Sequence, residues 1–119
     1  MATVTEQLRQ QRCVPCEGGV PALKPDEVER LLTGLPDWQL GERGKSIRRS
    51  WRVRDFDAAL DFFNRVARVA NAENHHPDLH LTGYRNVVIE IWTHAIDGLS
   101  SNDFILAAKI DDLPVELKK

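Results

Sequence analysis

Histidines are the side chains of this sequence best suited to proton transfer, and two of the four are adjacent. His75 and His76 stand directly before Pro77, and His94 follows later in the chain. Imidazole exchanges protons near neutral pH, because its unperturbed pKa is about 6.5. A residue before proline is disfavoured in the α region, so a helix that precedes the pair must end at or before His76. Both rings are then expected at a helix C-terminus, where the helix dipole favours a protonated ring that can act as a general acid.

These histidines have two other interpretations besides acid/base chemistry. The pair could be a helix end on the surface, with His76 capping free carbonyls and His94 exposed at a strand terminus. A metal site built from all three is less well supported, since adjacent histidines rarely chelate one ion from a regular element. No carboxylate motif such as His-Glu-x-x-His accompanies them. From the pair alone, proton transfer and a surface helix end are equally well supported.

Length and charge restrict the class of protein. A chain of 119 residues is typical of one domain with a single core. Its net charge of -2 gives no general attraction to nucleic acid or to anionic membranes. No apolar run approaches the roughly 20 residues that cross a bilayer, and the polar first residues do not resemble a secretory signal. Two cysteines cannot form a disulfide framework, so we expect a cytoplasmic protein.

The first 24 residues are predicted to form an irregular N-terminal arm, ahead of one domain over residues 25–119. The arm contains Cys13-Val14-Pro15-Cys16. Structural zinc usually takes four ligands, and the chain has no second cysteine pair. We therefore interpret Cys13 and Cys16 as ordinary thiols, with a zinc ion shared across a dimer as the alternative.

Two helices and two strands are predicted in the part of the chain before the histidines, and they must position the pair. A short helix is predicted from Pro25 to about residue 35, then strands around 38–40 and 47–53 joined by a turn at 41–44. The second strand should bury one face and expose a row of arginines, together with Ser46, to solvent. Asp55 is the predicted N-cap of a long helix over about 56–74. Its core face should include these apolar residues: Phe56, Ala59, Leu60, Phe62, Phe63, Val66, Ala67, Val69 and Ala70.

The second half of the chain predicts two more strands and a last helix. Residues 78–82 and 84–94 alternate in polarity around a turn at Gly83, and His94 falls on the more polar face. Ser100 and Asp103 form a capping-box pattern, which is enough to explain that aspartate. The helix that follows is apolar almost all round, so it should be deeply buried or shared with another subunit. Residues 113–119 are expected to fray.

These motifs together resemble those of the pterin-4a-carbinolamine dehydratases. The resemblance covers about residues 25–112, and the order of helices and strands also matches. It rests on His75-His76-Pro77, Tyr84, Thr93-His94, Gly98-Leu99-Ser100, Asp103 and Leu106-Ala107.

The resemblance implies an α+β domain, with a four-stranded antiparallel sheet and helices packed on one face. It implies homodimers that extend the sheet across subunits, some of which pair into homotetramers. The activity expected is that of a hydro-lyase without metal or cofactor, which dehydrates 4a-hydroxytetrahydropterin to quinonoid dihydropterin. This reaction recycles the tetrahydrobiopterin cofactor spent by aromatic amino acid hydroxylases. The alternative is a non-catalytic dimerisation module, because animal members also act as dimerisation cofactors for a transcription factor.

The same resemblance assigns residues to the site. His75 and His94 are the expected acid/base residues, and His76 is mainly a substrate contact. The other substrate-binding candidates are Glu73, Pro77, Tyr84 and Trp92. Many members carry an acidic residue four positions before the first histidine, where this chain has Asn71. Glu73 is then the candidate for the orienting role of that carboxylate.

Overall fold

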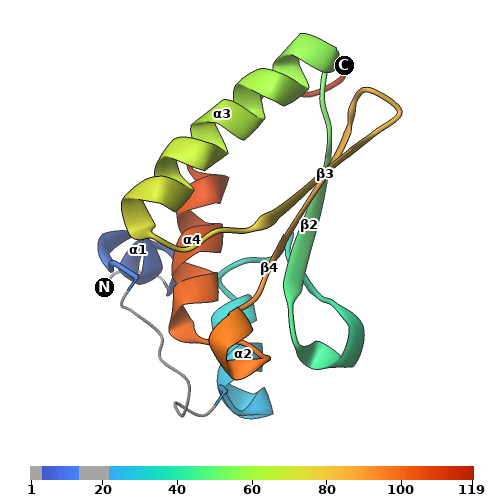
Figure 1. The fold of residues 1–119 in the computed structure, drawn as a ribbon. Coiled ribbons are helices and arrows are strands. Elements are labelled where there is room, and N and C mark those ends of the chain that lie inside the picture. Colours follow the sequence, from blue (N-terminus) through green and yellow to red (C-terminus); the bar gives the residue numbers. More distant parts are fainter. Residues whose placement is uncertain (1–3, 14–21) are drawn as a thin grey trace.

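A computed structural model describes residues 4–13 and 22–119. The helices are α1 (Val4–Gln10), α2 (Pro25–Leu32), α3 (Phe56–Glu73) and α4 (Ser101–Asp111), with short 3-10 turns η1 (Glu42–Gly44) and η2 (His94–Ile96). The strands are β1 (Gln39–Leu40), β2 (Ile47–Arg52), β3 (Asp78–Thr82) and β4 (Asn86–Ile91). They form one antiparallel sheet in the order β1-β2-β4-β3, and α3 and α4 lie together on one side of it (Figure 1). The predicted α+β fold is confirmed.

The sheet buries the face that the alternation of its residues predicts. On β4, Val87, Ile89 and Ile91 are completely buried, and on the neighbouring β2 the arginines of the opposite face, Arg48 and Arg52, are exposed. Ser46 is an exception to the predicted solvent face, since it is buried. Its hydroxyl donates to Glu90 Oε2 at 2.6 Å, and this hydrogen bond compensates for the lost hydration of both groups.

Helix α3 begins and ends where its sequence predicts. The Asp55 carboxylate accepts a hydrogen bond from the Ala58 N–H at 2.9 Å, as an N-cap does. At the other end Asn74 takes a left-handed conformation with φ 52°, and the His75 N–H donates to the Ala70 carbonyl. This arrangement closes the helix in the manner of a Schellman motif, directly before Pro77 prevents any continuation. The paired histidines therefore leave a helix C-terminus.

The predicted core face of α3 was partly wrong. Phe62 is completely buried, whereas Phe63 is only partly buried and Phe56 and Leu60 remain 48% and 42% exposed. The apolar stripe on this helix is wider than the surface that the sheet and α4 cover. The periodicity predicts the apolar stripe of α3 but not the residue at its centre, which is Phe62 and not Phe63.

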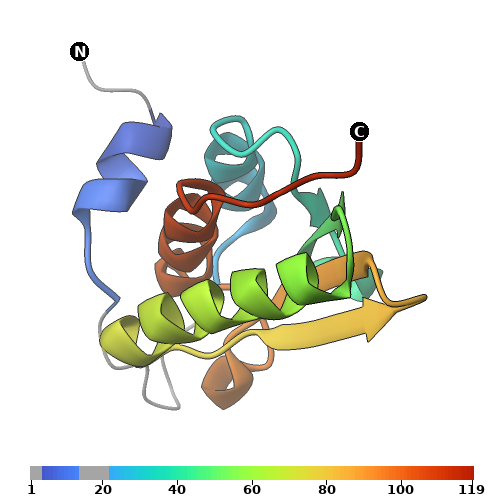
Figure 2. The same cartoon turned by 90° about the horizontal axis from the view of Figure 1, so that it is seen from above.

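Helix α4 is the centre of the helical layer. Its capping box is formed as predicted, with Ser100 and Asp103 each accepting from the other's backbone N–H. Most of its residues are buried, because α3 packs on one side of it and α1 on another (Figure 2). The flanking Leu99 and Phe104 are also buried, and they occupy the two positions of a hydrophobic staple.

Two segments that were predicted to be irregular, residues 4–10 and 113–119, form defined structure. The arm contains helix α1, whose Leu8 is only 3% exposed, and Arg9 Nε donates to the Ala108 carbonyl of α4. At the C-terminus, Leu117 pairs with Val53, so residues after α4 extend the sheet locally instead of fraying. Short segments of this kind are stabilised by tertiary contacts, which local sequence patterns do not reveal. Cys16 lies outside the described residues.

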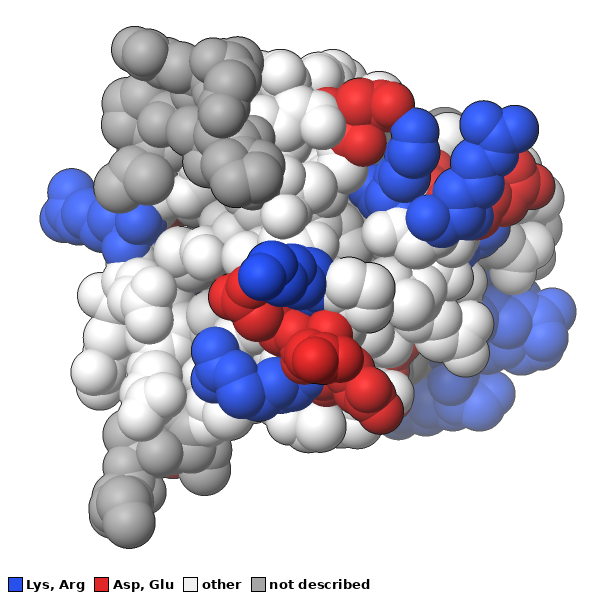
Figure 3. Space-filling view, turned by 90° about the horizontal axis from the view of Figure 1, so that it is seen from below, with Lys and Arg blue, Asp and Glu red and all other residues white. Residues whose placement is uncertain are grey.

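The surface carries charges of both signs. On the face seen in Figure 3, acidic side chains in the middle are flanked by basic ones. Lys45 and Asp97 form an exposed ion pair, with Nζ and Oδ2 2.6 Å apart. None of the helices in residues 4–13 and 22–119 is both long enough and apolar enough to cross a membrane.

Candidate active site

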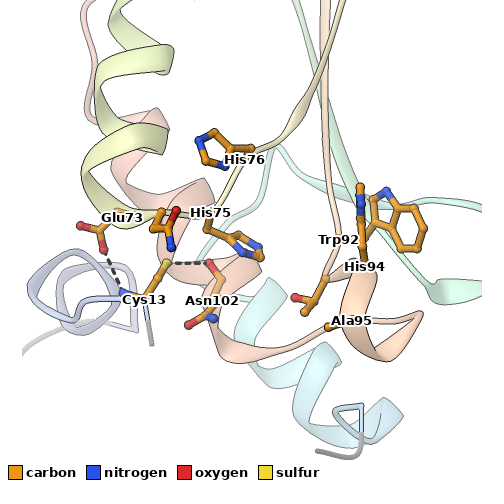
Figure 4. A pocket seen from close by; sticks show the side chains of 10 residues that line it. Cys13, Glu73, His75, His76, Trp92, His94, Ala95 and Asn102 are labelled. Atoms are coloured by element: carbon orange, nitrogen blue, oxygen red, sulfur yellow. Dashed lines mark hydrogen bonds between the residues drawn. The ribbon is translucent and has the colours of Figure 1, made fainter. Parts of the chain in front are cut away.

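A pocket of about 440 Å³ lies between the C-terminal end of α3 and the end of β4. Figure 4 shows the histidine pair entering it from one side and His94 facing it from the other. Three separate parts of the chain build it: the segment after α1, the end of α3, and the β4–η2–α4 region. The residues that line it are Cys13, Glu73, Asn74, His75, His76, Trp92, Thr93, His94, Ala95 and Asn102.

The two adjacent histidines have different environments. His75 is largely buried, with a side chain 13% exposed, and its Nε2 lies 2.6 Å from Oδ1 of the fully buried Asp103. His76 is exposed, and its Nε2 lies 3.0 Å from the Asn71 amide oxygen. The carboxylate can stabilise positive charge on the His75 ring, and among the described residues Nδ1 has no hydrogen-bond partner. The hydrogen bond to the Asn71 amide can orient the His76 ring, but it places no negative charge beside that ring.

His94 and Trp92 form the opposite end of the pocket (Figure 4). Their ring centroids are 4.0 Å apart, and the planes are tilted by 41°. The indole Nε1 donates to Asp78 Oδ2 at 3.3 Å, which fixes the plane of the larger ring. The pocket therefore has a flat aromatic surface beside a ring that exchanges protons.

Asp103 is the site residue that sequence reasoning did not identify, because capping explained it sufficiently. Its Oδ2 accepts from the Ser100 N–H at 2.8 Å and from the Thr93 hydroxyl at 2.9 Å, while Oδ1 faces His75. The Ser100 hydroxyl lies 2.7 Å from Thr93 Oγ1 and completes the network. One carboxylate thus caps α4 and anchors His75, and only the folded chain brings these two partners together.

Of the remaining predicted site residues, some line the pocket and others do not. Glu73 lines the pocket, but its carboxylate already binds the Cys13 N–H at 2.9 Å and Lys109 Nζ at 3.1 Å. Burial by itself raises the pKa of Glu73, yet these two donors hold that pKa below its usual value. Pro77 and Tyr84 do not line the pocket, and Tyr84 is 56% exposed at the turn between β3 and β4.

Cys13 is a second residue that sequence reasoning did not place in the site. Its thiol donates to the Asn102 carbonyl at 3.5 Å, and burial, followed by the charge of Glu73, raises its pKa to about 12. It is a free cysteine. Within the described part of the chain, no cluster of three or more His, Cys, Asp and Glu side chains is suited to hold a metal ion.

Comparison with known proteins identifies similar sequences over most of the chain. The family model described as pterin 4 alpha carbinolamine dehydratase matches residues 21–113. The mitochondrial pterin-4-alpha-carbinolamine dehydratase 2 of Arabidopsis thaliana is 51% identical over 112 residues, which cover 92% of this chain and 60% of the plant protein. A putative pterin-4-alpha-carbinolamine dehydratase of Rubrobacter xylanophilus is 49% identical over 107 residues, covering 90% of this chain and 98% of its own.

The fold has a counterpart among solved structures. The crystal structure of a transcriptional coactivator/pterin dehydratase from Brucella melitensis superimposes with a TM-score of 0.70 at 29% sequence identity. The match covers 76% of this chain and 95% of the other.

Proposed function

The chain belongs to the pterin 4 alpha carbinolamine dehydratase family, whose reaction is that of a hydro-lyase, and from this premise we propose how its residues catalyse the reaction. The substrate is a 4a-hydroxytetrahydropterin, and the products are quinonoid dihydropterin and water. His75 and His94 act as the acid/base pair. The planar substrate lies in the pocket between His75 and His94, where Trp92 and His76 contact it.

The reaction moves two protons and needs no oxidant. One proton is delivered to the C4a hydroxyl, the C4a–O bond breaks, and water leaves. A second proton leaves a ring nitrogen, and its electron pair forms the new double bond. A positioned acid or base typically accelerates such a step by about 10²–10⁴-fold.

Geometry supports a division of roles between the two rings. The buried carboxylate of Asp103 stabilises positive charge on His75, so we assign proton delivery to the Nδ1 of His75. Within the described residues His94 forms no ion pair, and it is exposed at the other end of the pocket. It is assigned to remove the proton from the ring nitrogen. The observation that carries this proposal is one pocket lined by all three histidines, one of them anchored on a buried acid.

Stopped-flow kinetics test the proposal directly. The 4a-carbinolamine is generated in the instrument, and its dehydration is followed by the absorbance of quinonoid dihydropterin. The wild-type protein should accelerate this decay in proportion to its concentration, with saturation by substrate. A rate no greater than that given by the same concentration of free imidazole contradicts the proposal.

Replacing Asp103 with asparagine should lower kcat by about 10–100-fold, the usual cost of removing a carboxylate partner from a functional histidine at metal sites. The amide keeps the size of the side chain but removes the charge that stabilises protonated His75. Comparison of kcat and KM for D103N measures the effect, with Asp61→Asn on the exposed face of α3 as the control. Equal kcat values for wild type and D103N would show that Asp103 only caps α4.

The cellular setting is also a proposal. The reaction recycles a tetrahydropterin cofactor spent by an aromatic amino acid hydroxylase. The free thiol of Cys13 fits a reducing compartment such as the cytoplasm, although the name of the plant relative places that protein in mitochondria. The exposed Phe56 and Leu60 of α3 support a homodimer or homotetramer, in which a second subunit covers them.

A further inference from the structure

The N-terminal segment, residues 4–13, reaches the pocket from outside the part of the chain that the family model matches. Helix α1 packs against α4 through Leu8, which is only 3% exposed. The segment then ends with Cys13 in the pocket lining, at the opposite end from Trp92 and His94 (Figure 4). A wall of the pocket therefore depends on how this segment docks.

Glu73 connects the segment to the body of the domain. Its side chain is only 9% exposed, and both its oxygens have partners: Oε1 accepts the Cys13 N–H, and Oε2 faces Lys109 Nζ. A second contact, from the Cys13 thiol to the Asn102 carbonyl, lies beside the first. If the segment lifted away, this nearly buried carboxylate would lose a backbone donor, which costs free energy unless water replaces it.

We propose that Glu73 is a positioning residue that fastens residues 4–13 to the pocket, so that Cys13 forms the wall of the pterin site opposite Trp92 and His94. This inference rests on the proposed function, because it concerns how that site holds its substrate. The wall lies away from the assigned proton-transfer groups. Its loss should therefore weaken substrate binding and leave the chemical step nearly unchanged.

A direct contact between the Glu73 carboxylate and the substrate is the competing explanation, and two substitutions separate it from the proposal. In Glu73→Gln the amide oxygen can still accept the Cys13 N–H, whereas in Glu73→Leu nothing can. We expect E73L to raise KM about tenfold, the effect of losing one net interaction of about 1.4 kcal/mol, with kcat within about twofold of wild type. E73Q should restore most of the affinity. If E73Q raises KM as much as E73L, the charge itself binds substrate and the proposal is wrong.

A second experiment undocks the segment without touching the pocket. Leu8→Asp places a charge at the buried contact with α4, and Gln7→Asp adds the same charge at an exposed position of α1. Docking is measured by alkylation of Cys13 with iodoacetamide at pH 8, in a Cys16→Ser background. Cys13 should react slowly in the docked state, since burial raises its pKa to about 12 and little thiolate is present.

We expect L8D to speed alkylation of Cys13 and to raise KM about tenfold, while Q7D matches wild type in both measurements. Fast alkylation with an unchanged KM would overturn the proposal, because the wall would then be irrelevant to binding. Slow alkylation of Cys13 in E73L would also overturn it, since docking of the segment would then not depend on Glu73. A wild-type protein without dehydratase activity would instead refute the proposed function, and the alkylation rates would still report docking.

Discussion

Replacing His75 with alanine is expected to lower kcat for carbinolamine dehydration by about 10²–10⁴-fold, the usual contribution of one positioned acid or base. The ring occupies the position where a buried carboxylate and the pocket meet, with Nε2 used by Asp103 and Nδ1 left for the substrate. The adjacent His76 cannot replace this arrangement, because it is exposed and bonded to Asn71. Stopped-flow turnover of H75A and wild type measures the loss.

The chain supplies its own control for this variant. His80 is exposed on β3 and does not line the pocket, so His80→Ala should keep wild-type turnover. His75→Ala also leaves the buried Asp103 without one partner, which should reduce the free energy of unfolding by about 1–3 kcal/mol. Circular dichroism must therefore show that H75A is folded at the assay temperature. Folded H75A with wild-type kcat would remove His75 from the mechanism.

The sequence predicted the position of the histidine pair because the relevant signals are local. Pro77 excludes a continuing helix, and Asn74 accepts the left-handed conformation that ends α3. Alternation on β4 predicted which face is buried and therefore that Thr93 points inward while His94 does not. Each of these signals depends on residues only a few positions apart, so the local sequence pattern is enough to predict it.

The residues that sequence reasoning missed are joined by long-range contacts. Asp103 meets His75 only because α4 packs against the end of α3, and the capping pattern gave no sign of this second partner. Cys13 reaches the pocket only because α1 docks on α4, through Leu8 and the hydrogen bond from Arg9 to Ala108. Nothing within either segment distinguishes these contacts from ordinary capping or an ordinary thiol. Tyr84, which the resemblance assigned to substrate binding, does not line this pocket and is exposed at the turn between β3 and β4.

Phe62 should contribute far more to stability than its neighbour Phe63. Replacing a fully buried phenylalanine with alanine costs about 3–5 kcal/mol of unfolding free energy, from lost burial and the cavity that remains. Phe62 is completely buried and packs edge-on against Trp51, with ring centroids 5.1 Å apart. Phe63 is only partly buried, so Phe63→Ala should cost clearly less. Urea unfolding of both variants under identical conditions measures the two changes.

This pair of variants also tests how the fold positions the site. Phe62 fixes the rotation of α3 about its axis, and that rotation sets the direction in which the chain delivers His75 to Asp103. We therefore expect folded Phe62→Ala to lose kcat as well as stability, whereas Phe63→Ala keeps its kcat. A larger loss of unfolding free energy in F63A than in F62A would mean that the face of α3 covered in solution differs from the one buried here. The partner subunit proposed to cover Phe56 and Leu60 would then be the first explanation to test, by measuring the unfolding midpoint at several protein concentrations.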